Sequence, residues 1–567
     1  MVRMTEELSL NMQHPPVETN HAILGSCPGP VLLLIMDGWG VGSGGPEDAI
    51  ARANTPVFDR LWRDYAHTEL MTHGHYVGLP SGKDMGGSEV GHLTMGAGQI
   101  LDQGPTRINK AIADGSFYHS EALQQVLSIE QGSALHLLGL LSDGNIHSHL
   151  DHFKALIDIA FERGIRRLYV HALLDGRDVA IQSAQNYVAV LESAFATINS
   201  HEGFHYAFAS GGGRERIIMD RDRDWSKVEA GWNLMVHGCG EARFPSMMAA
   251  IAYFRAQDAG LVDQDMPGFV IVGSDDVPVG TVRDGDAVVM VNFRGDRAIE
   301  VTEAFELDDF DGFDRGVRPD VIYAGMMVYD EDRNLPDLQL MGPTKVAEPF
   351  GKRVLEMGIR QFRLTETQKY PHVTFFFNGG YRQPLDPAME DYILIQSDRG
   401  VSFADAPQMK SAEIADKAVE LIESGRYGFG LINFANADMV GHCGKIEPAI
   451  AAIEAVDEAV GRIIDALQKC GGRALITADH GNAEEMQVFD KAGHAEASTK
   501  HSINPVPCIL FDPTFDGSYS LRQPRDGDTA AIRPGLSHLA ATLYAMMGQL
   551  PPADFNPSLI EPVSFLS

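Results

Sequence analysis

A serine in a glycine-rich segment is the first candidate for chemistry in this chain. Ser88 stands in Gly86–His92, where small neighbours let a nucleophile and an incoming anion approach without side-chain obstruction. A segment of this kind is by itself most often an ordinary turn. The metal-ligand residue types far downstream instead favour Ser88 as a metal-activated nucleophile.

Carboxylates and histidines at the ends of expected strands could bind metal ions. A lone histidine is usually structural and an Asp before Gly usually belongs to a turn, but together the set indicates a site. Mixed nitrogen and oxygen ligands suit Mn²⁺, Zn²⁺ or Mg²⁺. Two ions about 3.5–4 Å apart would clamp a phosphoryl group and lower the pKa of the serine hydroxyl. The candidate ligands are Asp37, Asp438, His442, Asp479, His480 and His501, with Ser88 as a further oxygen.

Five arginines follow other expected strands and could bind an anionic substrate. The net charge of −33, from 45 basic and 78 acidic residues, would repel a phosphorylated substrate globally, so a local basic cluster is required. Guanidinium groups bind phosphate and carboxylate bidentately. Most single arginines form surface ion pairs, but five at strand ends favour a pocket. They are Arg177, Arg214, Arg221, Arg294 and Arg297.

Buried apolar strands must position these side chains. Strands alternating with helices predict an α/β fold with mostly parallel sheets, in which ligands bind beyond the carboxyl ends of the strands. Helices are expected at 411–424 and 447–468. The expected strands are 31–36, 135–141, 167–172, 287–292, 429–434 and 473–478.

The order of the candidates along the chain predicts two domains. Asp37 and Ser88 must meet residues 438–501 if they share metal ions, so the arginine-rich segment between them is an insertion. We therefore expect a discontinuous metal-binding domain formed by 31–102 and 344–567. Residues 103–343 form the inserted substrate-binding domain, and residues 1–30 are an N-terminal extension.

Composition narrows the class of protein further. The acidic balance argues against nucleic acid and anionic membrane surfaces as partners. The five cysteines are scattered without a disulfide or zinc pattern, and the apolar run 31–36 is too short to span a bilayer. We expect a cytoplasmic protein that acts as a monomer on a small molecule.

The motifs together resemble those of the cofactor-independent (2,3-bisphosphoglycerate-independent) phosphoglycerate mutases, members of the alkaline-phosphatase-like superfamily. The resemblance spans Asp37 to His501, and the triple glycine before Arg214 resembles the longer plant and trypanosomatid branch. The motifs that carry it are 36–40, 85–92, 142–149, 175–178, 292–297, 365–370, 438–442, 477–482 and His501 with its following Pro-Val-Pro.

The resemblance implies interconversion of 3-phosphoglycerate and 2-phosphoglycerate, an isomerase reaction of glycolysis and gluconeogenesis, through a phosphoserine at Ser88. It implies two divalent ions, with Mn²⁺ favoured over Mg²⁺, Co²⁺ or Zn²⁺, and no 2,3-bisphosphoglycerate. One ion would be held by Asp37, Ser88, Asp479 and His480, and the other by Asp438, His442 and His501. Asp178 would shuttle protons. Substrate would be bound by His147, Arg177, Asp178, Arg214, Arg221, Arg294, Arg297 and Lys369.

Several alternatives stay open. Gly87 stands where the family usually has Asn, Arg216 is a rival to Arg214, and His494 is a rival to His501. A metal-dependent phosphatase or a phosphopentomutase of the same superfamily is the alternative activity. A non-catalytic metal- or phosphate-binding protein is the alternative from another class.

Overall fold

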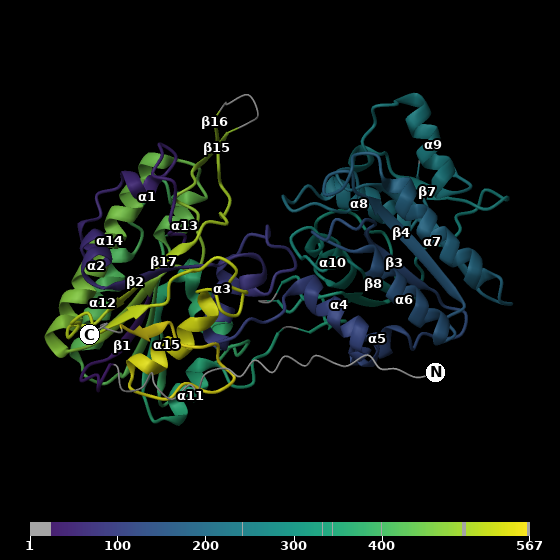
Figure 1. The fold of residues 1–567 in the computed structure, drawn as a ribbon. Helices are drawn as coiled ribbons and strands as arrows, with labels where there is room; N and C mark the ends of the chain where they lie inside the picture. The colour runs from purple at the N-terminus through teal and green to yellow at the C-terminus, as the bar shows by residue number, and fades with distance from the viewer. Residues whose placement is uncertain are drawn as a thin grey trace, which may run out of the picture. The chain divides into compact units, whose positions relative to one another are not determined.

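The computed structural model describes residues 24–240, 242–330, 333–342, 344–398, 400–489 and 495–563. Most of the expected extension, residues 1–23, lies outside these ranges. The chain divides into two compact units, drawn in Figure 1. Unit 1 contains the described residues up to Gln103 and from Thr344 onward, and unit 2 covers Gly104–Pro343. Among the described residues, no helix combines the length and apolarity that crossing a membrane requires.

Unit 1 is built on a seven-stranded sheet. The central strands Val31–Met36 and Phe429–Phe434 are buried throughout and, apart from Asn433, apolar, as expected where helices cover both faces. All neighbouring strands pair in parallel except around β17, which runs antiparallel to both neighbours. The sheet order is β12 (Glu390–Ile395), β11 (Gln361–Glu366), β13 (Phe429–Phe434), β1 (Val31–Met36), β14 (Arg473–Thr477), β17 (Val506–Phe511) and β2 (Ala66–Leu70).

Helices cover both faces of this sheet (Figure 1). One layer contains α1 (Ala49–Arg52), α2 (Pro56–Asp64), α12 (Ser411–Glu423), α13 (Asn436–Gly441) and α14 (Ile446–Cys470). The other contains α3 (Ser88–Ala97), α11 (Phe350–Glu356) and α15 (Leu539–Met546). Two short antiparallel strand pairs, β15 (Gln487–Phe489) with β16 (Ala495–Ala497) and β18 (Tyr519–Leu521) with β19 (Ile560–Pro562), lie outside the main sheet.

Unit 2 contains an eight-stranded sheet that is parallel through its first six strands. The order is β10 (Leu338–Gln339), β9 (Ile322–Gly325), β8 (Ala287–Met290), β3 (Leu135–Leu140), β4 (Arg167–Leu174), β5 (His205–Gly213), β7 (Phe269–Ile271) and β6 (Ala242–Phe244). The associated helices are α4 (Gly104–Asp114), α5 (Glu121–Val126), α6 (Leu150–Glu162), α7 (Ala184–Asn199), α8 (Trp225–Met235), α9 (Met247–Gln257) and α10 (Ile299–Glu306).

Buried polar side chains join three central strands of unit 2. Nδ1 of His136 lies 3.0 Å from Nε2 of His171, and Nδ1 of His171 lies 2.7 Å from Oγ of Ser210. The pairing of β4 with β5 shifts register at His171, which is the signature of a β-bulge. These hydrogen bonds satisfy polar groups that would otherwise be costly to bury.

The α/β fold class with mostly parallel sheets is confirmed. The expected strands at 31–36 and 429–434 coincide with β1 and β13, and the expected helix 447–468 is α14. One local expectation was wrong, because Ser88 is the first residue of a helix rather than part of a loop. Gly211–Gly213 end strand β5, so Arg214 directly follows a strand, as expected.

Candidate metal centre and anion-binding loops

The metal-ligand candidates of unit 1 meet at one edge of its sheet. Asp37 directly follows β1, Asp479 and His480 follow β14, and Asp438 lies in α13 just beyond β13. Because these three strands are parallel neighbours, their carboxyl ends lie together. The backbone N–H of Asp438 donates to the carbonyl oxygen of Asp37 at 3.0 Å, which ties two of the loops to each other.

Gly38 makes this close approach possible. Its φ of +78° is in the left-handed region that side chains disfavour. A Cβ at this position would also lie 2.6 Å from the Cα of Asp438. Both the backbone conformation and the contact therefore require glycine between the first strand and the site.

Ser88 presents its hydroxyl at the amino terminus of α3. Its Oγ lies 3.0 Å from Nε2 of His480 and 3.4 Å from Oδ1 of Asp37. A helix amino terminus favours negative charge through its unpaired N–H groups and its dipole. This position suits an oxygen that receives an anionic group.

Gly87 precedes the serine with an extended backbone, φ −151°. An added Cβ would lie 3.5 Å from Cε1 of His501, an ordinary van der Waals distance. Neither the backbone nor the space at this position demands glycine.

Lys369 lies among the acidic candidates of unit 1, although the sequence grouped it with the arginines. Its Nζ donates to Oδ1 of Asp37, Oγ of Ser88 and Oδ2 of Asp438, each at 2.7 Å. Burial opposes the ammonium charge, but Asp37 and Asp438 outweigh it and hold the pKa of Lys369 above its usual value. The lysine therefore carries a buried positive charge in contact with the candidate nucleophile.

Two histidines direct the same ring nitrogen at Asp438. Nε2 of His442 lies 3.2 Å from Oδ1 of Asp438, and Nε2 of His501 lies 3.3 Å from the same oxygen. The Nδ1 atoms lie 2.8 Å from the carbonyl oxygens of Thr499 and Gly86. Nδ1–H donation to a carbonyl orients each ring so that Nε2 can bind a metal ion once it has lost its proton, which is the arrangement of metal-binding histidines. The rival His494 lies outside the described residues.

The charges of this cluster depend on burial and on one another. Burial and the neighbouring Asp479 raise the pKa of Asp37 to about 6. Burial and His501 lower the pKa of His480 to about 3, which keeps that imidazole neutral. Burial also opposes ionisation of Asp438, but Lys369 and the histidines hold its pKa well below the usual value.

The donor set fits divalent cations. Oδ2 of Asp479 is fully buried and accepts no hydrogen bond from the described residues. Candidate ligand atoms of Asp438, His480 and His501 lie within 4.8 Å of one another, as do those of Asp37, His92 and Asp479. Carboxylate oxygens with neutral imidazole nitrogens are ligands for Mn²⁺, Zn²⁺ and Mg²⁺.

His92 is a site residue that sequence reasoning missed. It lies one helical turn after Ser88, and its Nδ1 is 2.8 Å from the carbonyl oxygen of Ser88 and 3.4 Å from Oδ2 of Asp479. Burial lowers its pKa to about 4. The i to i+4 spacing from the serine was the available signal, since such residues share a helix face.

In unit 2, Asp175 organises the loop after β4. Its Oδ2 accepts a hydrogen bond from Oγ of Ser142 at 2.6 Å, and its Oδ1 accepts from Nη1 of Arg214 at 3.0 Å. Arg214 also donates to Asp178 from the same nitrogen. The candidate proton carrier and a candidate substrate arginine are therefore in direct contact.

The environments of Arg214 and Arg216 differ sharply. Arg214 is 1% exposed and is held by two carboxylates. Arg216 is exposed, and its Nε donates to the carbonyl oxygen of Asp265 at 3.3 Å. The geometry favours Arg214 over its rival.

Two acidic residues hold the remaining candidates of unit 2, and sequence reasoning did not identify either. Glu215 lies 3.2 Å from Arg177 and 3.7 Å from Arg297. Asp296 contacts the others, with distances of 3.1 Å to Arg294, 3.8 Å to Arg221 and 3.5 Å to His147. Burial and the surrounding arginines lower the pKa of His147 to about 2, so this imidazole is neutral. The structure thus gathers all seven candidates of this unit around carboxylates.

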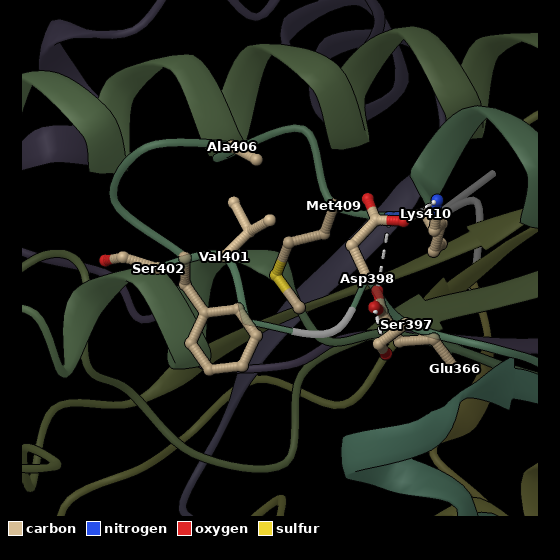
Figure 2. A pocket seen from close by; sticks show the side chains of 9 residues that line it. Glu366, Ser397, Asp398, Val401, Ser402, Ala406, Met409 and Lys410 are labelled. Atoms are coloured by element: carbon tan, nitrogen blue, oxygen red, sulfur yellow. Dashed lines mark hydrogen bonds and ion pairs between the residues drawn. The ribbon is translucent and has the colours of Figure 1, made fainter.

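A separate small pocket lies where β11 and β12 end (Figure 2). It is lined by Glu366, Ser397, Asp398, Val401, Ser402, Phe403, Ala406, Met409 and Lys410. Lys410 pairs with Asp398 at 2.8 Å, and Ser397 donates to Glu366 at 2.8 Å. Its charged groups are therefore already paired, and none of the predicted site residues lines it.

Comparison with known proteins gives a consistent assignment. The model of the Metalloenzyme superfamily matches residues 29–548. A probable 2,3-bisphosphoglycerate-independent phosphoglycerate mutase from Leptospira interrogans is 42% identical over 545 residues, covering 94% of this chain and 97% of that protein. The 2,3-bisphosphoglycerate-independent phosphoglycerate mutase of Trypanosoma brucei brucei is 41% identical over 543 residues, with the same coverage.

A solved structure points the same way. The phosphoglycerate mutase of Leishmania mexicana, crystallised at low cobalt concentration, is 40% identical and has a TM-score of 0.64. The match covers 94% of this chain and 98% of that chain. By sequence over nearly its whole length, this chain belongs to the family of 2,3-bisphosphoglycerate-independent phosphoglycerate mutases within the metalloenzyme superfamily.

Proposed function

We propose that this chain interconverts 3-phosphoglycerate and 2-phosphoglycerate through a phosphoserine at Ser88, without 2,3-bisphosphoglycerate. One observation carries the proposal: the buried hydroxyl of Ser88 contacts Lys369 and His480 at the amino terminus of a helix. An oxygen placed there can receive a phosphoryl group, because the helix dipole and the lysine both stabilise the negative charge.

Divalent ions, for which we propose Mn²⁺, would be held in two sites with the ligand sets predicted from the family. Asp37, Ser88, Asp479 and His480 form one set, and Asp438, His442 and His501 form the other. When bound, such ions lower the pKa of the serine hydroxyl and neutralise charge on the phosphoryl group. The Nε2 atoms of His442 and His501, which both lie beside Oδ1 of Asp438, support this assignment.

The transfer proceeds in two balanced steps. Deprotonated Oγ of Ser88 forms a bond to phosphorus as the bond from phosphorus to the substrate oxygen breaks. The released alkoxide takes a proton from Asp178, which gives bound glycerate. Asp178 then accepts the proton of the other glycerate hydroxyl as that oxygen takes the phosphoryl group back from Ser88.

The basic residues of unit 2 would bind the substrate anions. Arginine forks match the geometry of carboxylate and phosphate oxygens, and Arg177 and Arg294 already contact carboxylates of the protein. Holding glycerate prevents its loss before the second transfer. The residues assigned this role are His147, Arg177, Asp178, Arg214, Arg221, Arg294 and Arg297, with Lys369 from unit 1.

Product analysis tests the proposal. Protein supplied with Mn²⁺ and 3-phosphoglycerate should form 2-phosphoglycerate, and Ser88→Ala should form none. Release of inorganic phosphate and glycerate without 2-phosphoglycerate would instead identify a phosphatase.

We further propose that the protein acts as a monomer in the cytoplasm. Size-exclusion chromatography with light scattering would test the oligomeric state, and localisation of the tagged chain would test the compartment.

A further inference from the structure

We propose that Glu484 is a positioning residue that holds three metal-ligand loops of unit 1 in register with one another. This inference rests on the proposed function only for the identity of the ligands. Glu484 is 1% exposed and belongs to neither of the predicted ligand sets. Its role is to connect loops that reach the site from distant parts of the chain.

Four donors from three loops converge on the Glu484 carboxylate. Oε2 accepts from the backbone N–H of Gly40 at 3.1 Å and of Asn482 at 2.8 Å. Oε1 accepts from the Oγ of Ser502 and from the Nδ2 of Asn504 at 3.0 Å. Each carboxylate oxygen is therefore shared between donors.

These donors stand close to the candidate ligands in the chain. Gly40 lies three residues after Asp37, Asn482 lies two residues after His480, and Ser502 directly follows His501. The three loops carry ligands of both predicted ions. A shift of Glu484 would therefore be transmitted to both metal sites.

Three glycines make room for this side chain. A Cβ at Gly40 would lie 2.2 Å from Cδ of Glu484, and a Cβ at Gly42 would lie 2.8 Å from its Cβ. A Cβ at Gly481 would meet Oε1 of the glutamate at a sub-van der Waals distance. The surrounding backbone is thus fitted to a carboxylate at this place, which is a second observation independent of the hydrogen bonds.

A carboxylate accepts from all four donors at once. Two oxygens each accept two hydrogen bonds, and no donor is needed from the side chain itself. The amide of glutamine has one acceptor oxygen fewer. Its NH₂ group would either oppose the backbone N–H groups of Gly40 and Asn482, or face Ser502 and Asn504 and require both of these side chains to turn round as acceptors. Glu484→Gln therefore keeps the size of the side chain and disturbs the connection between the loops.

The test compares two variants of the full-length chain that each remove one buried negative charge from unit 1. Glu484→Gln breaks the proposed connection. Asp457→Asn is the matched control, because Asp457 is buried and accepts backbone N–H groups of Val57 and Phe58 at 3.0 and 2.7 Å. Each protein is stripped of metal with a chelator, dialysed and titrated calorimetrically with Mn²⁺, and its melting temperature is recorded.

Glu484→Gln should weaken Mn²⁺ binding about 10- to 100-fold, as is typical when a group that orients metal ligands is lost. Excess Mn²⁺ should restore kcat toward the wild-type value, which a purely structural defect would not allow. Asp457→Asn should bind Mn²⁺ like the wild type. Wild-type affinity in Glu484→Gln, or equal losses of affinity in both variants, would overturn the proposal.

A milder variant covers the case in which Glu484→Gln does not fold. Ser502→Ala removes one donor and leaves the carboxylate in place, so it should weaken Mn²⁺ binding by a smaller factor. Unchanged affinity in Ser502→Ala would then overturn the proposal. These binding measurements need no substrate, so a wild-type protein that binds Mn²⁺ but forms no 2-phosphoglycerate would refute the proposed function alone.

Discussion

Oγ of Ser88 lies 3.0 Å from Nε2 of His480, although the two residues are 392 positions apart in the chain. The contact depends on α3 and on the loop after β14 reaching the same edge of one sheet. Both side chains are buried, and the imidazole is neutral because burial and His501 lower its pKa. A hydroxyl in this environment can lose its proton once cations reach the neighbouring carboxylates.

Removal of metal should abolish activity and destabilise unit 1. Without cations, the carboxylates of Asp37, Asp438 and Asp479 repel one another in a buried cluster that Lys369 compensates in part. We expect chelation to eliminate turnover and to lower the melting temperature, and added Mn²⁺ to reverse both effects. Enzyme assays and calorimetry on chelated and reloaded samples check this. Full activity after exhaustive chelation would contradict it.

Replacement of Lys369 should affect the metal-free protein most. Lys369→Met removes the buried positive charge between two carboxylates, and such losses cost about 3–5 kcal/mol of unfolding free energy. Mn²⁺ should offset part of this cost, because cations neutralise the same carboxylates. Urea denaturation with and without Mn²⁺ measures the difference. Lys410→Met is the control, because it removes a lysine of unit 1 that does not contact these carboxylates in the structure. Its cost in unfolding free energy should be the same with and without Mn²⁺. An equal cost of Lys369→Met in both conditions would refute the argument.

Arg214 and Arg216 provide a matched pair for testing substrate binding. Arg214→Lys replaces the guanidinium, whose Nη1 contacts both Asp175 and Asp178, with a shorter ammonium group that cannot bind an anion bidentately, so kcat/KM should fall about 100-fold, equivalent to about 2.7 kcal/mol. Arg216→Lys should stay within about twofold of the wild type, as exposed substitutions usually do. Steady-state kinetics with 3-phosphoglycerate distinguishes the two. The reverse ranking would assign the role to Arg216.

Glu306 in unit 2 should make stability depend on pH. Burial raises its pKa to about 7, above the value in the unfolded chain, so the folded protein binds the extra proton. Stability contributed by this group is present at low pH and is lost as the pH rises toward 7. Glu306→Gln should therefore melt like the wild type at pH 5 and at a higher temperature than the wild type at pH 8. Thermal melts at pH 5 and pH 8 test this, with Glu202→Gln at an exposed position as the control. The same difference in melting temperature between Glu306→Gln and the wild type at both pH values would contradict the assignment.

Residues adjacent to strong local patterns could be predicted from the sequence. Asp37 and Asp479 each follow a largely apolar, buried segment, and a buried parallel strand leads its next residues to the ligand-binding edge of a sheet. This reasoning also placed Asp438 beyond the strand at 429–434. The helix that begins at Ser88 was not predicted, because Gly86, Gly87 and Gly91 are residues that disfavour helices.

Other features could not be read from local patterns because their partners are distant. Glu484 bonds to Gly40 across 444 positions, and nothing near either residue indicates the contact. Glu215 and Asp296 could only be identified once the loops carrying the arginines were placed. His136 and His171 each interrupt an otherwise apolar strand segment. The hydrogen bond that pairs them joins two adjacent strands, so neither segment alone could indicate it.

The central claim is that Ser88 carries the phosphoryl group during turnover. The most direct measurement is rapid quenching of the Mn²⁺-loaded protein with isotopically labelled 3-phosphoglycerate, followed by mass spectrometry of the peptide that contains Ser88. The account predicts substrate-derived phosphate on Ser88 within one turnover, passing into 2-phosphoglycerate. Formation of 2-phosphoglycerate at the normal rate with Ser88 never labelled, or by Ser88→Ala, would contradict it.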